Sequence, residues 1–226
     1  MRLIVDHVTR YSYDQPVRGV VQSHRLTPSV FEGQTVVDWQ VTVTDGCPGG
    51  VFRDGAGDRV QAWSVAGPVS EIVVHVRGVV ETRDLTGVLR GHREIVRPEV
   101  YLRETTPTWA DAALIELSSA ADDASGPLDA AHRLSGAVAD AIAYEPGTTE
   151  AHTTAAEALA QGKGVCQDHA HALIAMARHR GIPARYVSGY LFADAEGRPH
   201  EAAHAWAELW IVGLGWVGFD PANRCC

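Results

Sequence analysis

Residues 162–183 read GKGVCQDHAHALIAMARHRGIP and contain the most sharply defined helix of the chain. On one face of this helix lie the apolar or small residues at positions 166, 170, 173, 176 and 177. Basic residues at 178–180 fill the last turn, where they complement the helix dipole. Gly181 supplies the C-cap and Pro183 prevents continuation. We therefore predict a helix from about Cys166 to Arg180.

Cys166 stands at the entrance of this helix, directly after residues 162–165. Backbone N–H groups and the positive end of the helix dipole face a side chain at such a position. They favour a thiolate over a thiol, and they can hold the oxyanion that forms when a carbonyl is attacked. A lone cysteine is otherwise a small buried hydrophobic residue. The residues downstream decide between these two interpretations.

A nucleophilic thiol needs a base, and the base needs an orienting group. His204 stands at the head of a predicted strand over 205–212, and Asp220 follows a predicted strand over 216–219. If the two strands pair as a hairpin around residues 213–215, the start of the first meets the end of the second. We therefore expect His204 and Asp220 to lie within hydrogen-bonding reach of each other.

Three segments then occur in order: GVCQDHAH at 164–171, GIPARYVSGY at 181–190, and HAW at 204–206 with GWVGFDPAN at 215–223. Together they strongly resemble the bacterial transglutaminase-like superfamily, whose bacterial members are described as candidate cysteine proteases. The strand-rich front half resembles the β domain that precedes this core in one bacterial subfamily. The resemblance implies that Cys166 is the nucleophile, His204 the base and Asp220 the orienting carboxylate.

The first part of the chain has the pattern of antiparallel strands. Val37, Trp39, Val41 and Val43 alternate with polar residues, and β-branched runs occupy 59–65 and 71–80. We predict an α+β fold. It would have an N-terminal antiparallel β-sandwich or barrel domain over 1–105 and a papain-like transglutaminase core over 106–226, with helices packed on an antiparallel sheet. Helices are expected over 107–119, 128–144 and 154–162.

A rival motif occurs at residues 200–204, HEAAH, which matches the HExxH signature of zinc hydrolases. That signature needs both histidines on one helix and a third ligand. Here a turn at 197–199 precedes it, a predicted strand follows it, and no histidine occurs after His204. We keep a zinc hydrolase as an alternative of another enzyme class.

Other polar residues near Cys166 receive simpler interpretations. His169 and His171, two positions apart on a helix, point in divergent directions and would not share a metal ion. We expect His169 to pack beside Cys166 and His171 to point elsewhere. Asp168 is interpreted as a carboxylate that complements the helix dipole. Tyr190 is a candidate hydroxyl near the oxyanion.

Composition excludes several classes of protein. The 226 residues are 46% hydrophobic and 21% charged, which is typical of a globular chain. A net charge of −9 disfavours nucleic acid as a partner, and no apolar run is long enough to span a membrane. The charged residue Asp6 interrupts the N-terminus too early for a signal peptide. We expect a cytoplasmic protein.

The four cysteines, at positions 47, 166, 225 and 226, form no paired framework and are expected to be reduced in the cytoplasm. Members of the resembled family continue for several strands past the pair formed here by Asp220 and Pro221. The resemblance therefore predicts a chain truncated at its C-terminus, which would account for the unusual ending Cys225-Cys226.

Together these features predict a cysteine-dependent acyl-transfer enzyme acting on peptide or protein amides through a thioester on Cys166. Hydrolysis, as in a peptidase or amidase, is the first expectation, because no amine-selecting site is recognisable. Transfer to an amine, as in a transglutaminase, is the alternative, and a binding module without catalysis is a third possibility. No cofactor or calcium ion is implied, because no oxygen-rich loop of the needed type occurs. The oligomeric state is left open.

Overall fold

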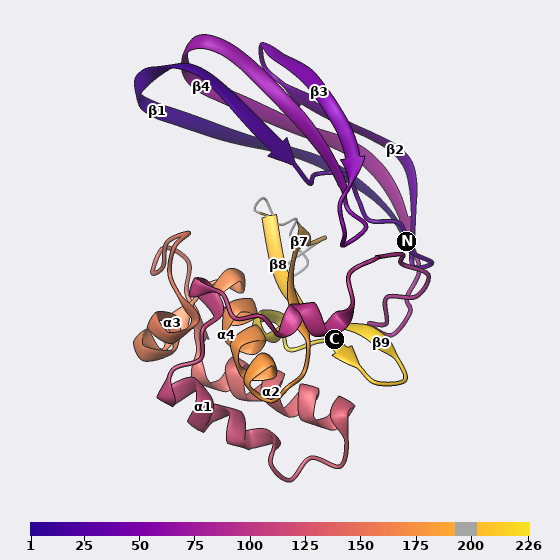
Figure 1. The fold of residues 1–226 in the computed structure, drawn as a ribbon, viewed down its shortest axis with the longest axis vertical. Coiled ribbons are helices and arrows are strands. Elements are labelled where there is room, and N and C mark those ends of the chain that lie inside the picture. The colour runs from indigo at the N-terminus through magenta and orange to yellow at the C-terminus, as the bar shows by residue number, and fades with distance from the viewer. Residues whose placement is uncertain (193–202) are drawn as a thin grey trace. The chain divides into compact units, whose positions relative to one another are not determined.

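The computed structural model describes residues 1–192 and 203–226. It divides into two compact units (Figure 1). The first, which we call the β unit, comprises Met1–Asp84 and Arg90–Val96. The second, the helix–sheet unit, comprises Leu85–Leu89 and Arg97–Cys226. Each unit is described on its own below.

The β unit is one antiparallel sheet built on two long strands. Strand β4 (Arg59–Thr82) pairs along its length with β1 (Arg2–His24). Its other edge is shared by β2 (Gln34–Val43), beside the second half of β4, and β3 (Gly46–Arg53), beside the first half. The α+β class is confirmed, but the predicted sandwich or barrel is replaced by this single sheet.

The β unit has one continuous sheet because β1 and β4 each run without a break. The predicted sandwich would need a turn in both strands to pass from one sheet to the other. Irregular pairing near Val17 lets both strands curve together, as Figure 1 shows. Val65 and Val74, from different halves of β4, belong to one buried cluster with Val43, Val69 and Ile72. The curvature therefore supplies the second apolar face that another sheet would have provided.

The helix–sheet unit places its helices before its main sheet. Its helical and short strand segments are η1 (Pro98–Leu102), η2 (Thr106–Thr108), α1 (Ala112–Ser118), η3 (Ser119–Ala121), α2 (Pro127–Ala141), β5 (Ala143–Tyr144), α3 (Ala155–Gln161), β6 (Lys163–Gly164) and α4 (Cys166–His179). The main sheet has the order β7 (Ala184–Tyr190), β8 (Ala203–Ile211) and β9 (Gly215–Phe219), all antiparallel, followed by η4 (Pro221–Asn223).

Helix α4 is the centre of this unit. It contacts α1, α2, α3, β7 and β8, and Leu173, Ile174 and Met176 on it are completely buried. Its end is as predicted, since Gly181 adopts a left-handed φ of 72° and the Ile182 N–H donates to the Ala177 carbonyl at 2.9 Å. Surrounding α4 with other elements gives Cys166, its first residue, a fixed position.

Two predicted helices have different boundaries in the structure. The helix expected from residue 107 begins at Ala112, because Asp111 is its N-cap and accepts the Leu114 N–H at 2.9 Å. The helix expected to reach Tyr144 ends at Ala141, because the chain then pairs as β5 with β6 in parallel. The second correction matters for function, since it places Tyr144 opposite Gly164.

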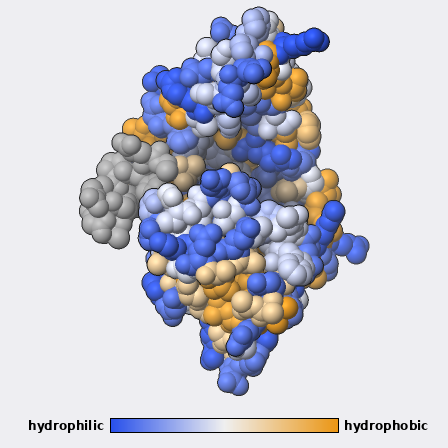
Figure 2. All heavy atoms as spheres, turned by 90° about the vertical axis from the view of Figure 1, so that its left-hand side faces the viewer, coloured by the Kyte–Doolittle hydropathy of each residue, from blue (hydrophilic) through white to orange (hydrophobic). Residues whose placement is uncertain are grey.

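The surface of the helix–sheet unit is mixed in character. On the face shown in Figure 2, hydrophilic residues cover much of the surface and hydrophobic residues gather over its lower part. Within residues 1–192 and 203–226, every helix is too short or too polar to span a lipid bilayer.

We predict that Leu173→Ala lowers the free energy of unfolding by about 2–5 kcal/mol, because the side chain is fully buried and its loss leaves a cavity. Denaturant unfolding followed by far-ultraviolet circular dichroism tests this, since the described helices lie in the helix–sheet unit. Val212→Ala is the control: Val212 is 78% exposed and its loss should cost less than about 0.5 kcal/mol. Equal effects of the two changes would contradict the prediction.

Candidate active site

Cys166 is the first residue of α4 and is partly exposed. Val165, directly before it, has an extended backbone and continues from β6. Of the N–H groups in the first turn, that of Asp168 donates to the Val165 carbonyl oxygen at 3.0 Å, which leaves those of Cys166 and Gln167 for an anion beside the sulfur. The predicted position of Cys166 at a helix entrance is therefore confirmed.

Asp168 has a larger structural role than the sequence analysis assigned to it. Its carboxylate is completely buried, and one oxygen, Oδ2, accepts both the Val165 N–H at 2.8 Å and the Thr149 hydroxyl at 2.6 Å. A Cβ on Gly164 would lie 2.7 Å from that oxygen, so only glycine leaves room for it. Asp168 thus ties the start of α4 to the loop that carries Thr149.

His204, near the start of β8, lies beside Asp220, as predicted. Strands β8 and β9 form the expected hairpin, with Ile211 opposite Gly215 and Ala207 opposite Phe219. Its open end brings Nε2 of His204 to 2.6 Å from Oδ2 of Asp220. His204 is 5% exposed, so this pair is shielded from water.

His204 also reaches the thiol. The Cys166 side chain lies close enough to act on the pKa of His204, and because Nε2 faces Asp220, Nδ1 is the ring nitrogen left for the sulfur. Burial by itself lowers the pKa of His204. The hydrogen bonds to Asp220 and Cys166, with the negative charges of both, outweigh burial and raise the pKa to about 9. The surroundings therefore favour the protonated imidazolium form of His204.

The Asp220 carboxylate is held in its ionised form. Burial by itself raises the pKa of Asp220, but hydrogen bonds from His204 and Asn223 outweigh it and hold the pKa below the usual range. Asn223 is a residue that the sequence analysis did not single out. Its position three residues after Asp220, in a one-turn helix that starts with proline, is the signal that was available.

Two tyrosines lie near the thiol, and neither is the one considered from the sequence. Burial, and then the negative charges of Cys166 and Asp220, raise the pKa of Tyr144. Burial, and then the charges of Cys166 and Asp168, raise the pKa of Tyr186 to about 12. Tyr190 lies further along β7, opposite Ala203. A role for its hydroxyl at the oxyanion stays a prediction.

The two histidines on α4 differ in their surroundings. His169 is buried, and its two ring nitrogens lie 2.9 Å from the Val165 carbonyl oxygen and 2.8 Å from that of Ile142. His171 packs against the Tyr186 ring, with 5.3 Å between centroids. Burial lowers the pKa of His171. His169 joins the start of α4 to the end of α2, which makes it a structural residue.

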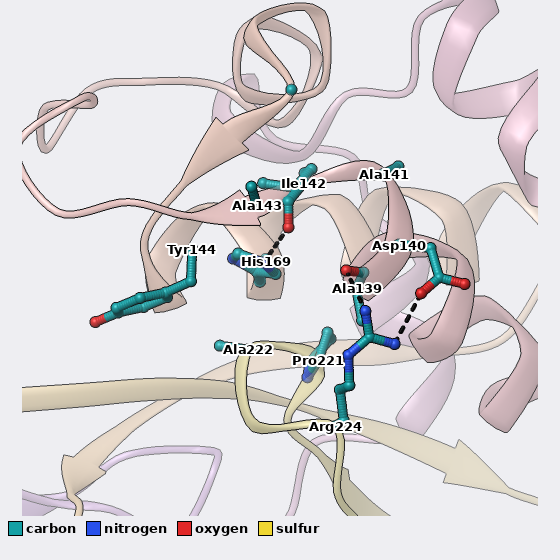
Figure 3. Close-up of a pocket in the computed structure, with 11 residues that line it drawn as sticks. Ala139, Asp140, Ala141, Ile142, Ala143, Tyr144, His169, Pro221, Ala222 and Arg224 are labelled. Atoms are coloured by element: carbon teal, nitrogen blue, oxygen red, sulfur yellow. Dashed lines mark hydrogen bonds and ion pairs between the residues drawn. The ribbon is translucent and has the colours of Figure 1, made fainter. Parts of the chain in front are cut away.

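A pocket of about 400 Å³ lies between the end of α2, the start of α4 and η4 (Figure 3). Tyr144, His169, Pro221 and Ala222 are among the residues that line it. Pro221 directly follows Asp220, so this pocket adjoins the site. At its edge Arg224 is paired with Asp140 at 2.7 Å and donates to the Ala139 carbonyl oxygen at 2.9 Å.

The HExxH alternative falls partly on residues that the structure does not describe, since His200 and Glu201 lie outside the described residues. His204 itself lies on strand β8, whereas the zinc signature requires its two histidines on a helix. Its Nε2 is also occupied by Asp220. The geometry of His204 is therefore that of an oriented base and differs from that of a ligand in this signature.

Comparison with known proteins identifies the family. A model of the transglutaminase-like superfamily matches residues 116–221, and a model of the bacterial transglutaminase-like N-terminal region matches residues 3–81. An uncharacterized protein of Mycobacterium leprae is 32% identical over 240 residues, covering 98% of this chain and 83% of that protein. The chain belongs to the transglutaminase-like superfamily.

Solved structures show the same fold. A protein from Cytophaga hutchinsonii, named a "Putative Cysteine Protease", matches with a TM-score of 0.74 and 20% identity, over 100% of this chain and 80% of that one. The periplasmic domain of TgpA from Pseudomonas aeruginosa, bound to ethylmercury, matches with a TM-score of 0.52 and 18% identity, over 100% and 74%. At these identities the likeness is one of transglutaminase-like fold.

We predict that Gly164→Ala disturbs the start of α4 in this transglutaminase-like core. The added Cβ would lie 2.7–2.8 Å from atoms of Asp168, so the first turn must shift, at a cost of about 1–3 kcal/mol. Alkylation of Cys166 by iodoacetamide, followed by mass spectrometry, should become slower. Gly136→Ala, in open space within α2, is the control and should leave both stability and alkylation unharmed. Unchanged alkylation in Gly164→Ala would refute the prediction.

Proposed function

We propose that this chain is a cysteine-dependent acyl-transfer enzyme in which Cys166, His204 and Asp220 act as nucleophile, base and orienting group. One observation carries the proposal: His204 is hydrogen-bonded to the Asp220 carboxylate at 2.6 Å and lies close enough to Cys166 for that side chain to raise the pKa of His204 as well. The three groups come from α4, β8 and the end of β9, so their convergence depends on tertiary structure. Membership of the transglutaminase-like superfamily supports the same assignment.

The proposed reaction uses each group in turn. The Cys166 thiolate attacks an amide carbonyl, and the N–H groups at the start of α4 stabilise the resulting oxyanion. His204, as imidazolium, gives its proton to the departing amine while a thioester forms on the sulfur. Asp220 keeps Nε2 protonated and directed away from the sulfur, so that Nδ1 faces the reacting atoms.

An acceptor then cleaves the thioester and releases the acyl group from Cys166. We propose water, which makes the enzyme a peptidase or amidase acting on a peptide or protein amide. His204 then takes a proton from the attacking water, and the intermediate collapses to a carboxylic acid and the Cys166 thiolate, which regenerates the thiolate and imidazolium. An amine in place of water would give the cross-linking alternative.

We also propose a cytoplasmic location, with which four free cysteines are consistent.

We predict that an activated ester, such as p-nitrophenyl acetate, acylates Cys166 and that mass spectrometry finds the added acyl group on its peptide. Cys166→Ala should lower the acylation rate by at least about a thousandfold, because the nucleophile is lost. The control is Cys47→Ala, which removes an exposed thiol from the β unit and should leave the rate unchanged. Added amines then compete with water to release the acyl group, and the proportion of amide to free acid in the product identifies the acceptor.

The same experiment separates the rival functions. A binding module without catalysis would give no acylation of Cys166 beyond that of Cys47. A zinc hydrolase would contain stoichiometric metal, lose activity with a chelator and keep it in Cys166→Ala. Either result would overturn the proposal.

We predict that acylation by an amide substrate is lost as the pH rises through about 9, where the raised pKa of His204 lies. Because the folded pKa is above the ordinary value, the imidazolium that protonates the leaving amine is present throughout the neutral range and disappears above it. Alkylation by iodoacetamide needs no such proton and should persist at high pH.

The pH above which acylation is lost, which we call the basic limit, should be lower in Asp220→Asn. The substitution removes the neighbouring negative charge that raises the pKa of His204. The control is Asp140→Asn, which removes an exposed carboxylate that pairs with Arg224. It should leave the limit unchanged. If acylation by Asp220→Asn is still lost near pH 9, a group other than His204 sets that limit.

A further inference from the structure

The turn that follows Asp220 is built around the Asp220 carboxylate. Asp220 is the N-cap of η4, and its backbone pairs with Cys225, with N–H to O distances of 2.8 and 3.2 Å. Arg224, with a left-handed φ of 54°, closes the turn and attaches it to α2 through Asp140. Within this turn, Asn223 is the residue whose side chain reaches Asp220.

Asn223 contacts the carboxylate through two groups. Its backbone N–H donates to Oδ1 of Asp220 at 3.3 Å, and its side-chain Nδ2 donates to Oδ2 at 2.7 Å. The oxygen that accepts from Nδ2 is the one that accepts from His204 at 2.6 Å. Nδ2 lies 3.2 Å from Nε2 of His204 as well. Nε2, Oδ2 and Nδ2 therefore form a closed triangle.

This arrangement restrains the rotation of the carboxylate. The terminal torsion of an aspartate is broad, so a carboxylate with one partner turns easily. Here the backbone N–H of Asn223 holds Oδ1 of Asp220, and the side chain of Asn223 holds Oδ2. With both oxygens held, Oδ2 stays directed at Nε2 of His204. Two charge-assisted donors also favour the ionised carboxylate, which the imidazolium needs as its partner.

The side chain of Asn223 has no comparable role in packing. Asn223 is exposed and belongs to neither buried hydrophobic cluster of the described residues. A residue at this position supplies the backbone N–H whatever its side chain, unless it is proline. The side-chain amide is therefore the part whose contribution requires a functional explanation.

We propose that Asn223 is a positioning residue, which acts through Asp220 by holding the carboxylate ionised and its Oδ2 against Nε2 of His204. This inference rests on the proposed function. It adds a fourth group to the site, one that acts on the reacting atoms through Asp220 and His204.

The test compares Asn223→Ala and Asn223→Asp with the wild-type chain. Removing the amide donor should raise the pKa of Asp220, and replacing it with a second carboxylate should raise that pKa further, because like charges repel. The pH below which Cys166 acylation is lost, which we call the acid limit, should therefore be higher in Asn223→Ala than in the wild-type chain. It should be higher still in Asn223→Asp. At neutral pH, kcat should fall roughly tenfold with KM unchanged, because the base is less well oriented.

A second measurement does not depend on activity. The carboxyl carbon of Asp220, labelled with carbon-13 and assigned with Asp220→Asn, should titrate at higher pH in both variants. Melting temperatures should change by less than about 3 °C, since the substituted residue is exposed. Arg224→Gln is the matched control, because it loosens the same turn from α2 and keeps the Asn223 amide. Its acid limit should equal that of the wild-type chain.

The outcomes are distinct. An upward shift of the Asp220 titration in Asn223→Ala, without a shift in Arg224→Gln, supports the inference. An unchanged titration in Asn223→Ala, or an equal shift in Arg224→Gln, overturns it. If Asn223→Ala does not fold, the isosteric Asn223→Asp decides by the same criteria. Absence of acylation at Cys166 in the wild-type chain would instead refute the proposed function.

Discussion

The site depends on the hydrogen bond between Nε2 of His204 and Oδ2 of Asp220, at 2.6 Å in a place from which water is largely excluded. An imidazole buried alone would lose its proton readily, because burial disfavours the charged form. The carboxylate, together with the Cys166 side chain, reverses that preference and raises the pKa of His204 to about 9. The position and charge of the carboxylate thus decide whether His204 faces the sulfur as a proton donor.

The surrounding structure keeps the three groups in place by close packing at a few positions. Gly164 leaves room for Asp168, which holds the start of α4. Gly189, opposite His204 on β7, leaves room for the Trp206 ring, which would lie 2.6 Å from a Cβ there. The burial of α4 prevents its first residue from moving independently of the sheet. Rigid elements on both sides of the site fit a reaction that needs preorganised groups.

Much of the fold and of the candidate site was predictable from local patterns. The helix from Cys166 was predictable because its apolar face, basic last turn and C-terminal glycine all agree. The meeting of His204 and Asp220 followed from a short hairpin between alternating strands. The transglutaminase-like family followed from three ordered segments. The catalytic roles of Cys166, His204 and Asp220 remain a proposal that these patterns and the geometry support together.

Local sequence patterns therefore specify which segments near the site are helices and strands, and where a nucleophile, a base and a carboxylate occur, because periodicity and capping are local properties. Tertiary structure decided what touches those groups. The burial of Asp168 depends on Thr149, 19 residues away in a loop, and the position of Tyr144 depends on a two-residue parallel pairing. Likewise, the curvature that replaces a sandwich and the contact of Asn223 with Asp220 arise from register and side-chain packing, which no short pattern of residues specifies.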